Sequence, residues 1–411
     1  MKKVTLNNKV SLTDYEQVVG SKIINELRQI SKKLGNIKIV EINATAQGGG
    51  VAELLRSQIP FANALNIKAD WYVLPPNERF FMTTKGIYDC LQGLCNSKIA
   101  LDFDYYQSYL DSISSHLPEA DLYVLHDPQT LGLLPYLKHK SLIWRCHLDL
   151  TDAEPISFNW LKNFYNYFDQ VIFSLEAYKH DLESSRVSIV HPAIDPLSSK
   201  NIQLDTEQIK ATLHELNINP AIPYILQVSR FDKFKNQIGV IELYEQLKKR
   251  VPVLQCILAG NYADDDPEGF EYYATVQAKA RQVDDQNIKI IVDADNIQIN
   301  ALQQAASIVI QNSNKEGFGL TVTEPLWKKK IVFSRPVGGI TLQIINGKTG
   351  YYLAENDEKI LDSMARVIAK PQAYNQIGQA AHDLVKKHFV LPVMLRDYLN
   401  VYYQVINRVK K

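Results

Sequence analysis

The chain has no excess charge, few cysteines and no long apolar run. Its 411 residues include 45 Lys and Arg against 45 Asp and Glu, so the formal net charge is zero. This balance argues against a general nucleic-acid binder, although it leaves a local basic site open. No apolar run is long enough to span a bilayer, and residues 1–8 lack the apolar core of a signal peptide. We therefore expect a cytoplasmic protein with no nucleic-acid partner and no membrane span.

The four cysteines, Cys90, Cys95, Cys146 and Cys256, form no Cys-x-x-Cys pair. Cys146 and Cys256 stand in apolar stretches, which is typical of buried thiols. We expect four reduced thiols, as in a cytosolic protein. The sequence also contains no His-x-x-x-His, EF-hand, Walker A or Gly-x-Ser-x-Gly pattern, so it predicts no required metal or cofactor.

Length and periodicity predict two α/β domains in series, because 411 residues suit two or three domains with separate cores. Apolar strands alternate with helices between residues 37 and 190 and again between 224 and 334, as in doubly wound parallel sheets. A helix is predicted over Thr13–Leu34, and the prolines in His191–Asn201 indicate a linker. We expect two Rossmann-like domains that face a central cleft, followed by a helix that returns to the first domain. The predicted boundaries are 1–195, 196–385 and 386–411.

One strand–loop–helix corner, Gln311–Pro325, has the features of a phosphate site. It follows an apolar strand, Ser307–Ile310, and precedes a helix expected from Leu326 onward. Gly317 and Gly319 allow backbone N–H groups to approach a ligand, and the helix N-terminus behind them attracts phosphate.

Charged side chains in the second domain favour a sugar nucleotide over a simple phosphate. Glu316 and Glu324 lie in the same corner and would repel phosphate, so they are better suited to accept hydrogen bonds from hydroxyls. Arg230 and Lys235 follow the strand Tyr224–Val228, and together they suit a diphosphate. A solvated basic loop is the alternative interpretation of this pair.

Polar residues follow predicted strand ends in the first domain, where an open α/β sheet binds its ligand. Gly48–Gly50 offer unhindered backbone donors at the start of a helix, unless the loop is simply flexible and without a ligand. His126 and Asp127 follow one strand, and His147 and Asp149 follow another. A role in binding a sugar hydroxyl and a structural role both stay open for His147, as they do for His126 and Asp127.

Motifs in order across residues 43–350 resemble the retaining glycosyltransferases of the GT-B fold, in the large family 4 group. Arg230 with Lys235, and Glu316 with Glu324, resemble the nucleotide-sugar signature of that family. Other blocks resemble more specifically the trehalose synthases of the glycosyltransferring type and the related trehalose phosphorylases. These blocks are Asn43–Glu53, His126–Gln129, Trp144–Leu150, Ala193–Ser198, Ala263–Gly269 and Gly338–Ile340.

The resemblance implies three groups of site residues and no metal ligand. The expected catalytic residues are Arg230, Lys235, Glu316 and His147. The expected donor-binding residues are Gly49, Gly50, Gly317, Phe318, Gly319, Leu320 and Glu324. The expected acceptor-binding residues are Asp127, Gln129, Arg145 and Asp149.

The implied activity is transfer of glucose, with retention, from a nucleoside-diphosphate glucose to a sugar acceptor, with trehalose as the favoured product. The resemblance implies no protein nucleophile and no essential divalent metal. A trehalose phosphorylase that uses inorganic phosphate and a non-catalytic sugar-nucleotide-binding regulator remain alternatives. The expected partners are small sugars and sugar nucleotides, and a homodimer is compatible with the sequence.

Three departures from the family pattern bear on these alternatives. Asn236 stands where the family usually has Asp, and Pro325 where it usually has Ala. We expect Pro325 at a first helical position, where it would bias Glu324 away from helical dihedrals. Tyr88 and Asp89 replace the expected His-Asn pair, which indicates an acceptor other than glucose if that segment shapes the acceptor site.

Overall fold

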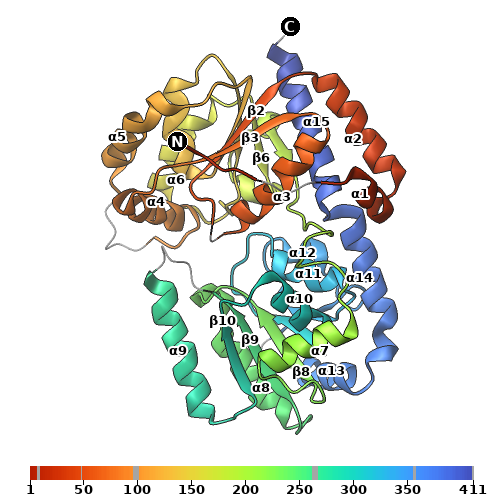
Figure 1. The fold of residues 1–411 in the computed structure, drawn as a ribbon. Helices are drawn as coiled ribbons and strands as arrows, with labels where there is room; N and C mark the ends of the chain where they lie inside the picture. The colour runs from red at the N-terminus through yellow and green to blue at the C-terminus, as the bar shows by residue number, and fades with distance from the viewer. Residues whose placement is uncertain (7–9, 48, 96–100, 262–266, 355–357, 410–411) are drawn as a thin grey trace. The chain divides into compact units, whose positions relative to one another are not determined.

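The structure is a computed structural model that describes residues 1–6, 10–47, 49–95, 101–261, 267–354 and 358–409. The chain divides into two compact units (Figure 1). Unit 1 comprises Met1–Ala193 and Leu391–Lys411, and unit 2 comprises Ile194–Val390. These divisions lie two and five residues from the boundaries expected at 195 and 385.

Unit 1 contains a seven-stranded sheet in the order β1-β3-β2-β4-β5-β6-β7. Its strands are β1 (Lys2–Lys3), β2 (Lys38–Asn43), β3 (Lys68–Val73), β4 (Leu122–His126), β5 (Ser141–Arg145), β6 (Gln170–Phe173) and β7 (Val187–Ile189). Among the strands of the described residues, β1 alone runs antiparallel to its neighbour. Because β2 pairs with both β3 and β4, the sheet changes its direction of growth between β2 and β4, where such folds bind ligands.

The helices of unit 1 are α1 (Leu12–Val19), α2 (Ser21–Leu34), α3 (Gly50–Ala64), α4 (Glu78–Leu91), α5 (Phe103–Ile113), α6 (Pro155–Tyr165) and α15 (Leu391–Val409). The single helix predicted over Thr13–Leu34 is wrong, since Gly20 takes a φ of 84° and separates α1 from α2. Helix α15 packs along α2, and Arg396 pairs with Glu26 across that contact at 3.6 Å.

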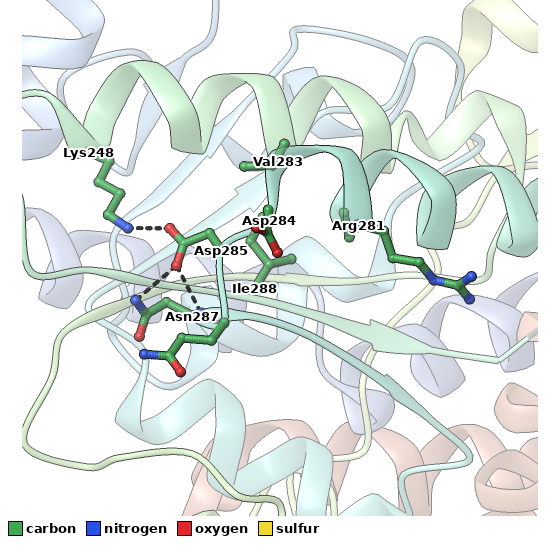
Figure 2. Close-up of a pocket in the computed structure, with 9 residues that line it drawn as sticks. Lys248, Arg281, Val283, Asp284, Asp285, Asn287 and Ile288 are labelled. Atoms are coloured by element: carbon green, nitrogen blue, oxygen red, sulfur yellow. Dashed lines mark hydrogen bonds and ion pairs between the residues drawn. The ribbon is translucent and has the colours of Figure 1, made fainter.

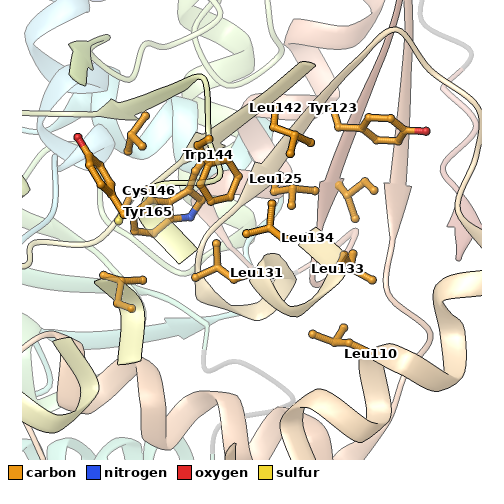
Figure 3. Close-up of a cluster of buried hydrophobic side chains, with 14 of the residues drawn as sticks. Leu110, Tyr123, Leu125, Leu131, Leu133, Leu134, Leu142, Trp144, Cys146 and Tyr165 are labelled. Carbon is orange, nitrogen blue, oxygen red and sulfur yellow. The ribbon is translucent and has the colours of Figure 1, made fainter. Parts of the chain in front are cut away.

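A leucine-rich cluster fills one face of the unit 1 sheet (Figure 3). Leu125 of β4 and Trp144 of β5 lie in it, together with leucines of a 3₁₀ segment, Pro128–Tyr136. Each fully buried leucine contributes about 1.5–3 kcal/mol of transfer free energy. The strand ends that carry Asp127 and His147 are thus attached to a packed core.

Unit 2 contains a parallel six-stranded sheet in the order β10-β9-β8-β11-β12-β13. Its strands are β8 (Tyr224–Val228), β9 (Gln255–Gly260), β10 (Ile288–Val292), β11 (Ile308–Gln311), β12 (Val332–Ser334) and β13 (Tyr351–Tyr352). Its helices are α7 (Thr206–Glu215), α8 (Gln237–Lys248), α9 (Pro267–Val283), α10 (Asn296–Ala305), α11 (Leu320–Trp327), α12 (Ile340–Gln343), α13 (Glu358–Ala369) and α14 (Asn375–His388). Here the direction of growth changes between β8 and β11, so the loops after these strands form the expected ligand edge.

Helix α11 begins at Leu320, six residues earlier than expected from Leu326. Gly319 caps it with a φ of 86°, which favours glycine. Pro325 therefore lies inside the helix and not at its first position, and Glu324 is helical. The expected bias of Glu324 away from helical dihedrals does not occur.

Cys90, at the end of α4, forms a disulfide with Cys95, so the expectation of four reduced thiols is wrong for this pair. The two cysteines are five positions apart, a spacing that matches no common redox or metal motif. Cys146 and Cys256 are free and buried, as expected. Within the described ranges, no helix is long and apolar enough to cross a membrane.

Candidate functional site

The two charged pairs predicted in separate stretches of unit 2 come together at its ligand edge. Lys235 follows β8 and Glu316 follows β11, and the lysine Nζ lies 2.8 Å from the glutamate Oε2. Ser313 Oγ donates a hydrogen bond to the same carboxylate oxygen at 3.3 Å. Both charged side chains are only partly exposed, at 17% and 12%, so the pair is shielded from solvent but within reach of a ligand.

The turn that carries Arg230 and Lys235 is fixed by its neighbours. Gly260, at the end of β9, leaves room for the turn, because a Cβ atom there would lie 1.7 Å from the carbonyl oxygen of Ser229. Gln237 Nε2 donates to the Arg230 carbonyl at 2.7 Å, and the Arg230 residue is exposed. The backbone of the turn is therefore fixed, whereas the guanidinium of Arg230 is accessible to a phosphate.

Asn236, the departure from the family pattern in this turn, has a structural explanation. Its φ of 52° places it in the left-handed region, which Asn tolerates better than most residues. Its side chain accepts a hydrogen bond from Gly239 N at 3.2 Å and so caps α8.

The loop before α11 presents backbone donors at a helix N-terminus. The carbonyl of Gly317 accepts a hydrogen bond from Gly339 N at 3.1 Å, and Gln343 Nε2 donates to the Phe318 carbonyl at 2.7 Å. Residues of α12 and of the segment before it thus fix the position of this loop. The N–H groups of Leu320 and Thr321, at the first positions of α11, are suited to bind phosphate, whereas those of Val322 and Thr323 donate to the Gly319 carbonyl at 2.9 and 3.2 Å.

Glu324 is almost fully buried, with 1% of its surface exposed. Its Oε1 lies 2.8 Å from Lys200 Nζ, and its Oε2 accepts from Gln303 Nε2 at 2.7 Å. Lys328 Nζ donates to the amide oxygen of Gln303 at 2.6 Å, and burial lowers the pKa of Lys328 to about 7. Sequence reasoning missed Lys200 and Gln303, since neither lies in a motif near Glu324.

A buried chain of polar groups lies at the ligand edge of unit 1. His126 Nε2 is 2.8 Å from Glu41 Oε2, and His126 Nδ1 is 3.0 Å from His147 Nε2. The two imidazole rings lie nearly parallel, with centroids 5.3 Å apart. Sequence reasoning missed Glu41, whose only signal is a carboxylate in the apolar strand β2.

Asp127 accepts a hydrogen bond from the backbone of His147 and has a strained backbone conformation. Its φ of 56° is unusual for a non-glycine residue, and its Oδ1 accepts a hydrogen bond from His147 N at 2.7 Å. Burial raises the pKa of Asp127 to about 6, against the lowering effect of that hydrogen bond. Burial, with the charges of Arg145 and His126, holds the pKa of His147 well below its ordinary value, so His147 is neutral.

The other residues expected to bind the acceptor differ in exposure. Arg145 is fully buried and donates from Nη2 to Ser174 Oγ and to the Val190 carbonyl, both at 3.1 Å. Its Nε and Nη1 are buried and have no hydrogen-bond partner among the described residues. Gln129 and Asp149 are half-buried, and Asp149 Oδ1 accepts from the backbone N–H of Thr151 at 3.0 Å.

The glycine loop of unit 1 ends where α3 begins. Gly49 is the N-cap of α3 and Gly50 its first residue, and both are exposed. A Cβ atom at either position would meet nothing within 4 Å, so packing does not require glycine there. Gly48 and residues 263–266 of the Ala263–Gly269 block lie outside the described residues.

An open hollow of about 850 Å³ lies elsewhere in unit 2 (Figure 2). Lys248, Arg281 and Asp285 line it, and Lys248 forms an ion pair with Asp285. These residues lie near the amino ends of the strands, whereas Lys235 and Glu316 follow the carboxyl ends of β8 and β11. The hollow is therefore separate from the candidate site.

Comparisons with known proteins identify the family of the chain. A family model described as "Trehalose synthase, N-terminal domain" matches residues 41–180, and one described as "Glycosyl transferases group 1" matches residues 209–384. The trehalose synthase of Thermococcus litoralis is 36% identical over 400 residues, which cover 95% of this chain and 96% of that relative. The trehalose phosphorylase of Pleurotus pulmonarius is 27% identical, over 84% of this chain and 54% of that protein.

The solved structure of a sucrose-phosphate synthase from Thermosynechococcus elongatus superimposes with a TM-score of 0.72. The two chains are 14% identical, and the match covers 91% of this chain and 100% of the other. At that identity the likeness concerns the fold alone, and it confirms the expected two-domain α/β architecture.

Proposed function

Because the chain belongs to the GT-B glycosyltransferases, in the family of the trehalose synthases, we propose that it transfers glucose from a nucleoside-diphosphate glucose to a sugar acceptor. The proposed transfer retains the anomeric configuration, and the favoured product is trehalose. The contact of Lys235 with Glu316 at the ligand edge of unit 2 carries the proposal, since it joins a phosphate-binding cation to a hydroxyl-binding carboxylate.

In the proposed donor site, Arg230 and Lys235 neutralise the departing diphosphate. The N-terminus of α11, with the backbone at Gly317–Leu320, binds one of its phosphates. Glu316 accepts hydrogen bonds from the glucose and Glu324 from the ribose. Preorganised charges aimed at a leaving group are usually the largest single contribution of a protein to such catalysis.

The proposed chemical step needs no protein nucleophile. The acceptor hydroxyl oxygen forms a bond to the anomeric carbon while the bond from that carbon to the phosphate oxygen breaks. The acceptor proton passes to the departing phosphate on the same face. His147 contacts the transferred glucose, and the proposed acceptor contacts are Asp127, Gln129, Arg145 and Asp149.

Two properties of the enzyme are part of the proposal. Because Arg230 and Lys235 supply positive charge for the diphosphate, we propose that activity survives removal of divalent metals with a chelator. We also propose a cytoplasmic location, and the Cys90–Cys95 disulfide is the observation against it, since reducing compartments keep thiols free.

The similarity to a trehalose phosphorylase supports a second candidate, phosphorolysis of trehalose. Inorganic phosphate would then occupy the diphosphate site. A grid of ADP-, UDP- and GDP-glucose against glucose and other sugars, with trehalose plus phosphate as a further reaction, tests both candidates. Trehalose or another disaccharide supports transfer, glucose 1-phosphate supports phosphorolysis, and nucleotide binding without any product supports a non-catalytic regulator.

Alanine variants test the diphosphate assignment. Arg230→Ala and Lys235→Ala should each lower kcat on the order of 10²–10³-fold while the fold survives. Lys233→Ala is the matched control, because Lys233 is an exposed cation in the same turn, and it should retain nearly full activity. Wild-type rates in both test variants would refute the assignment.

A further inference from the structure

A buried chain of hydrogen bonds leads from helix α15 to His147. Tyr402 OH and Gln58 Nε2 donate to Glu41 Oε1 at 3.0 and 2.7 Å, and His126 lies 2.8 Å from Oε2. Glu41, Gln58, His126 and Tyr402 are each at most 3% exposed. Hydrogen-bond donors surround Glu41, so its carboxylate is ionised and only accepts hydrogen bonds. The burial of such a charge is costly unless a partner compensates it.

The position of one proton follows from this carboxylate. Because Glu41 only accepts, His126 Nε2 must carry a hydrogen. The other nitrogen, His126 Nδ1, faces His147 Nε2 at 3.0 Å, and only one of these two nitrogens can carry the hydrogen between them. The charge of His126 decides which one does.

The charges around His126 favour its protonated form. The carboxylates of Glu41 and Asp127 face one permanent cation, the buried guanidinium of Arg145. A proton on His126 brings this group to zero net charge, which low-dielectric surroundings favour. The other titratable groups packed nearby stay neutral, because burial raises their pKa values: Cys146, Tyr398 and Tyr402.

We propose that Glu41 and His126 form a buried carboxylate–imidazolium pair that fixes His147 as the neutral Nδ1–H tautomer. His126 Nδ1–H donates to His147 Nε2, so His147 has only its Nδ1–H to offer a ligand. With a neutral His126 that keeps its hydrogen on Nε2, the pattern would reverse, and His147 Nδ1 would become an acceptor. Glu41 and His126 are thus positioning residues, and only the contact of His147 with a sugar hydroxyl depends on the proposed function.

The tautomers can be measured without any substrate. Nitrogen-15 NMR of histidine-labelled, ligand-free protein at neutral pH distinguishes protonated from bare ring nitrogens, and His126→Gln and His147→Gln assign the two signals. We expect His126 protonated on both nitrogens and His147 on Nδ1 alone. Protonation of His147 at Nε2 would overturn the proposal. This result stands or fails independently of whether the protein transfers glucose.

The variant Glu41→Gln keeps the shape of the side chain but removes the charge that stabilises the imidazolium. Because Oε1 already accepts from Tyr402 OH and Gln58 Nε2, the new amide nitrogen should replace Oε2 and donate to His126 Nε2. We therefore expect His126 to lose its Nε2 hydrogen and its positive charge, whereas His147 keeps its Nδ1–H. Ser31→Ala, which removes a buried hydrogen bond to the Leu65 carbonyl in the same unit, is the control and should change none of these.

A Glu41→Gln variant in which His126 still carries hydrogens on both ring nitrogens would overturn the proposal, even if that variant were less stable. If Glu41→Gln fails to fold, the wild-type spectrum alone decides. If the wild-type tautomer is as expected but no transfer activity is found with any donor, the positioning pair stands and the proposed function fails.

Discussion

Replacement of Asp127 by Asn should make unit 1 more stable at neutral pH. The Asp127 side chain is buried, and burial raises its pKa from 3.8 to about 6. Asn keeps an oxygen that can accept the hydrogen bond from His147 N, and it tolerates the φ of 56° about as well as Asp does. The substitution therefore preserves that hydrogen bond but removes one of the two carboxylates that face Arg145 and His126, so the gain in stability worked out below is an upper bound.

The size of the effect follows from linkage between protonation and folding. The folded chain holds the Asp127 proton to higher pH than the unfolded chain does, so stability falls as pH rises from about 4 to about 6 and stays reduced above. A shift of about two pKa units corresponds to roughly 3 kcal/mol. Asp127→Asn should gain up to about 3 kcal/mol at pH 7.5, and only about 1 kcal/mol at pH 4.5.

Urea unfolding followed by tryptophan fluorescence measures this difference. A chain with two units need not unfold in one step, so the probe must report on unit 1 alone. The substitution Trp327→Phe as a common background leaves only Trp71, Trp144 and Trp160, all in unit 1. A loss of stability at pH 7.5, or an equal gain at both pH values, would refute the reasoning.

Two further predictions concern the donor loop and the thiols. Gly339→Ala would place a methyl group 2.7 Å from Phe318 Cα, so the loop should shift and nucleotide affinity in calorimetry should fall roughly tenfold; unchanged affinity would contradict the packing. A chromogenic thiol reagent should titrate two thiols in unfolded, unreduced protein and four after reduction. Four thiols before reduction would show that the disulfide is absent.

The donor side of the site was predictable because its signals are local. Glycines, a diphosphate-binding Arg–Lys turn and two carboxylates each stand directly after a predicted strand. The alternation of strands and helices then predicts one shared sheet edge, and the contact of Lys235 with Glu316 agrees with it. The start of α11 was misplaced because Thr321–Thr323 interrupt the apolar pattern and Gly319 was assigned only to the loop.

The partners of these residues were not predictable, because they are distant in the chain. Glu41 and His126 are 85 residues apart, and Tyr402 lies 361 residues from Glu41. No sequence signal near a single carboxylate in an apolar strand identifies its partner. Likewise, nothing near Lys200 in the linker indicates that it pairs with Glu324. Only tertiary structure brings them together.

Helix α15 gives the protein an order of assembly during translation. Unit 2 is one unbroken segment, Ile194–Val390, and can fold as soon as the ribosome has released it. Unit 1 must wait for residues 391–409, because Tyr402 supplies a hydrogen bond to Glu41 and α15 covers α2. A chain that stops before α15 would therefore bear an intact donor-side unit beside an unfinished histidine site.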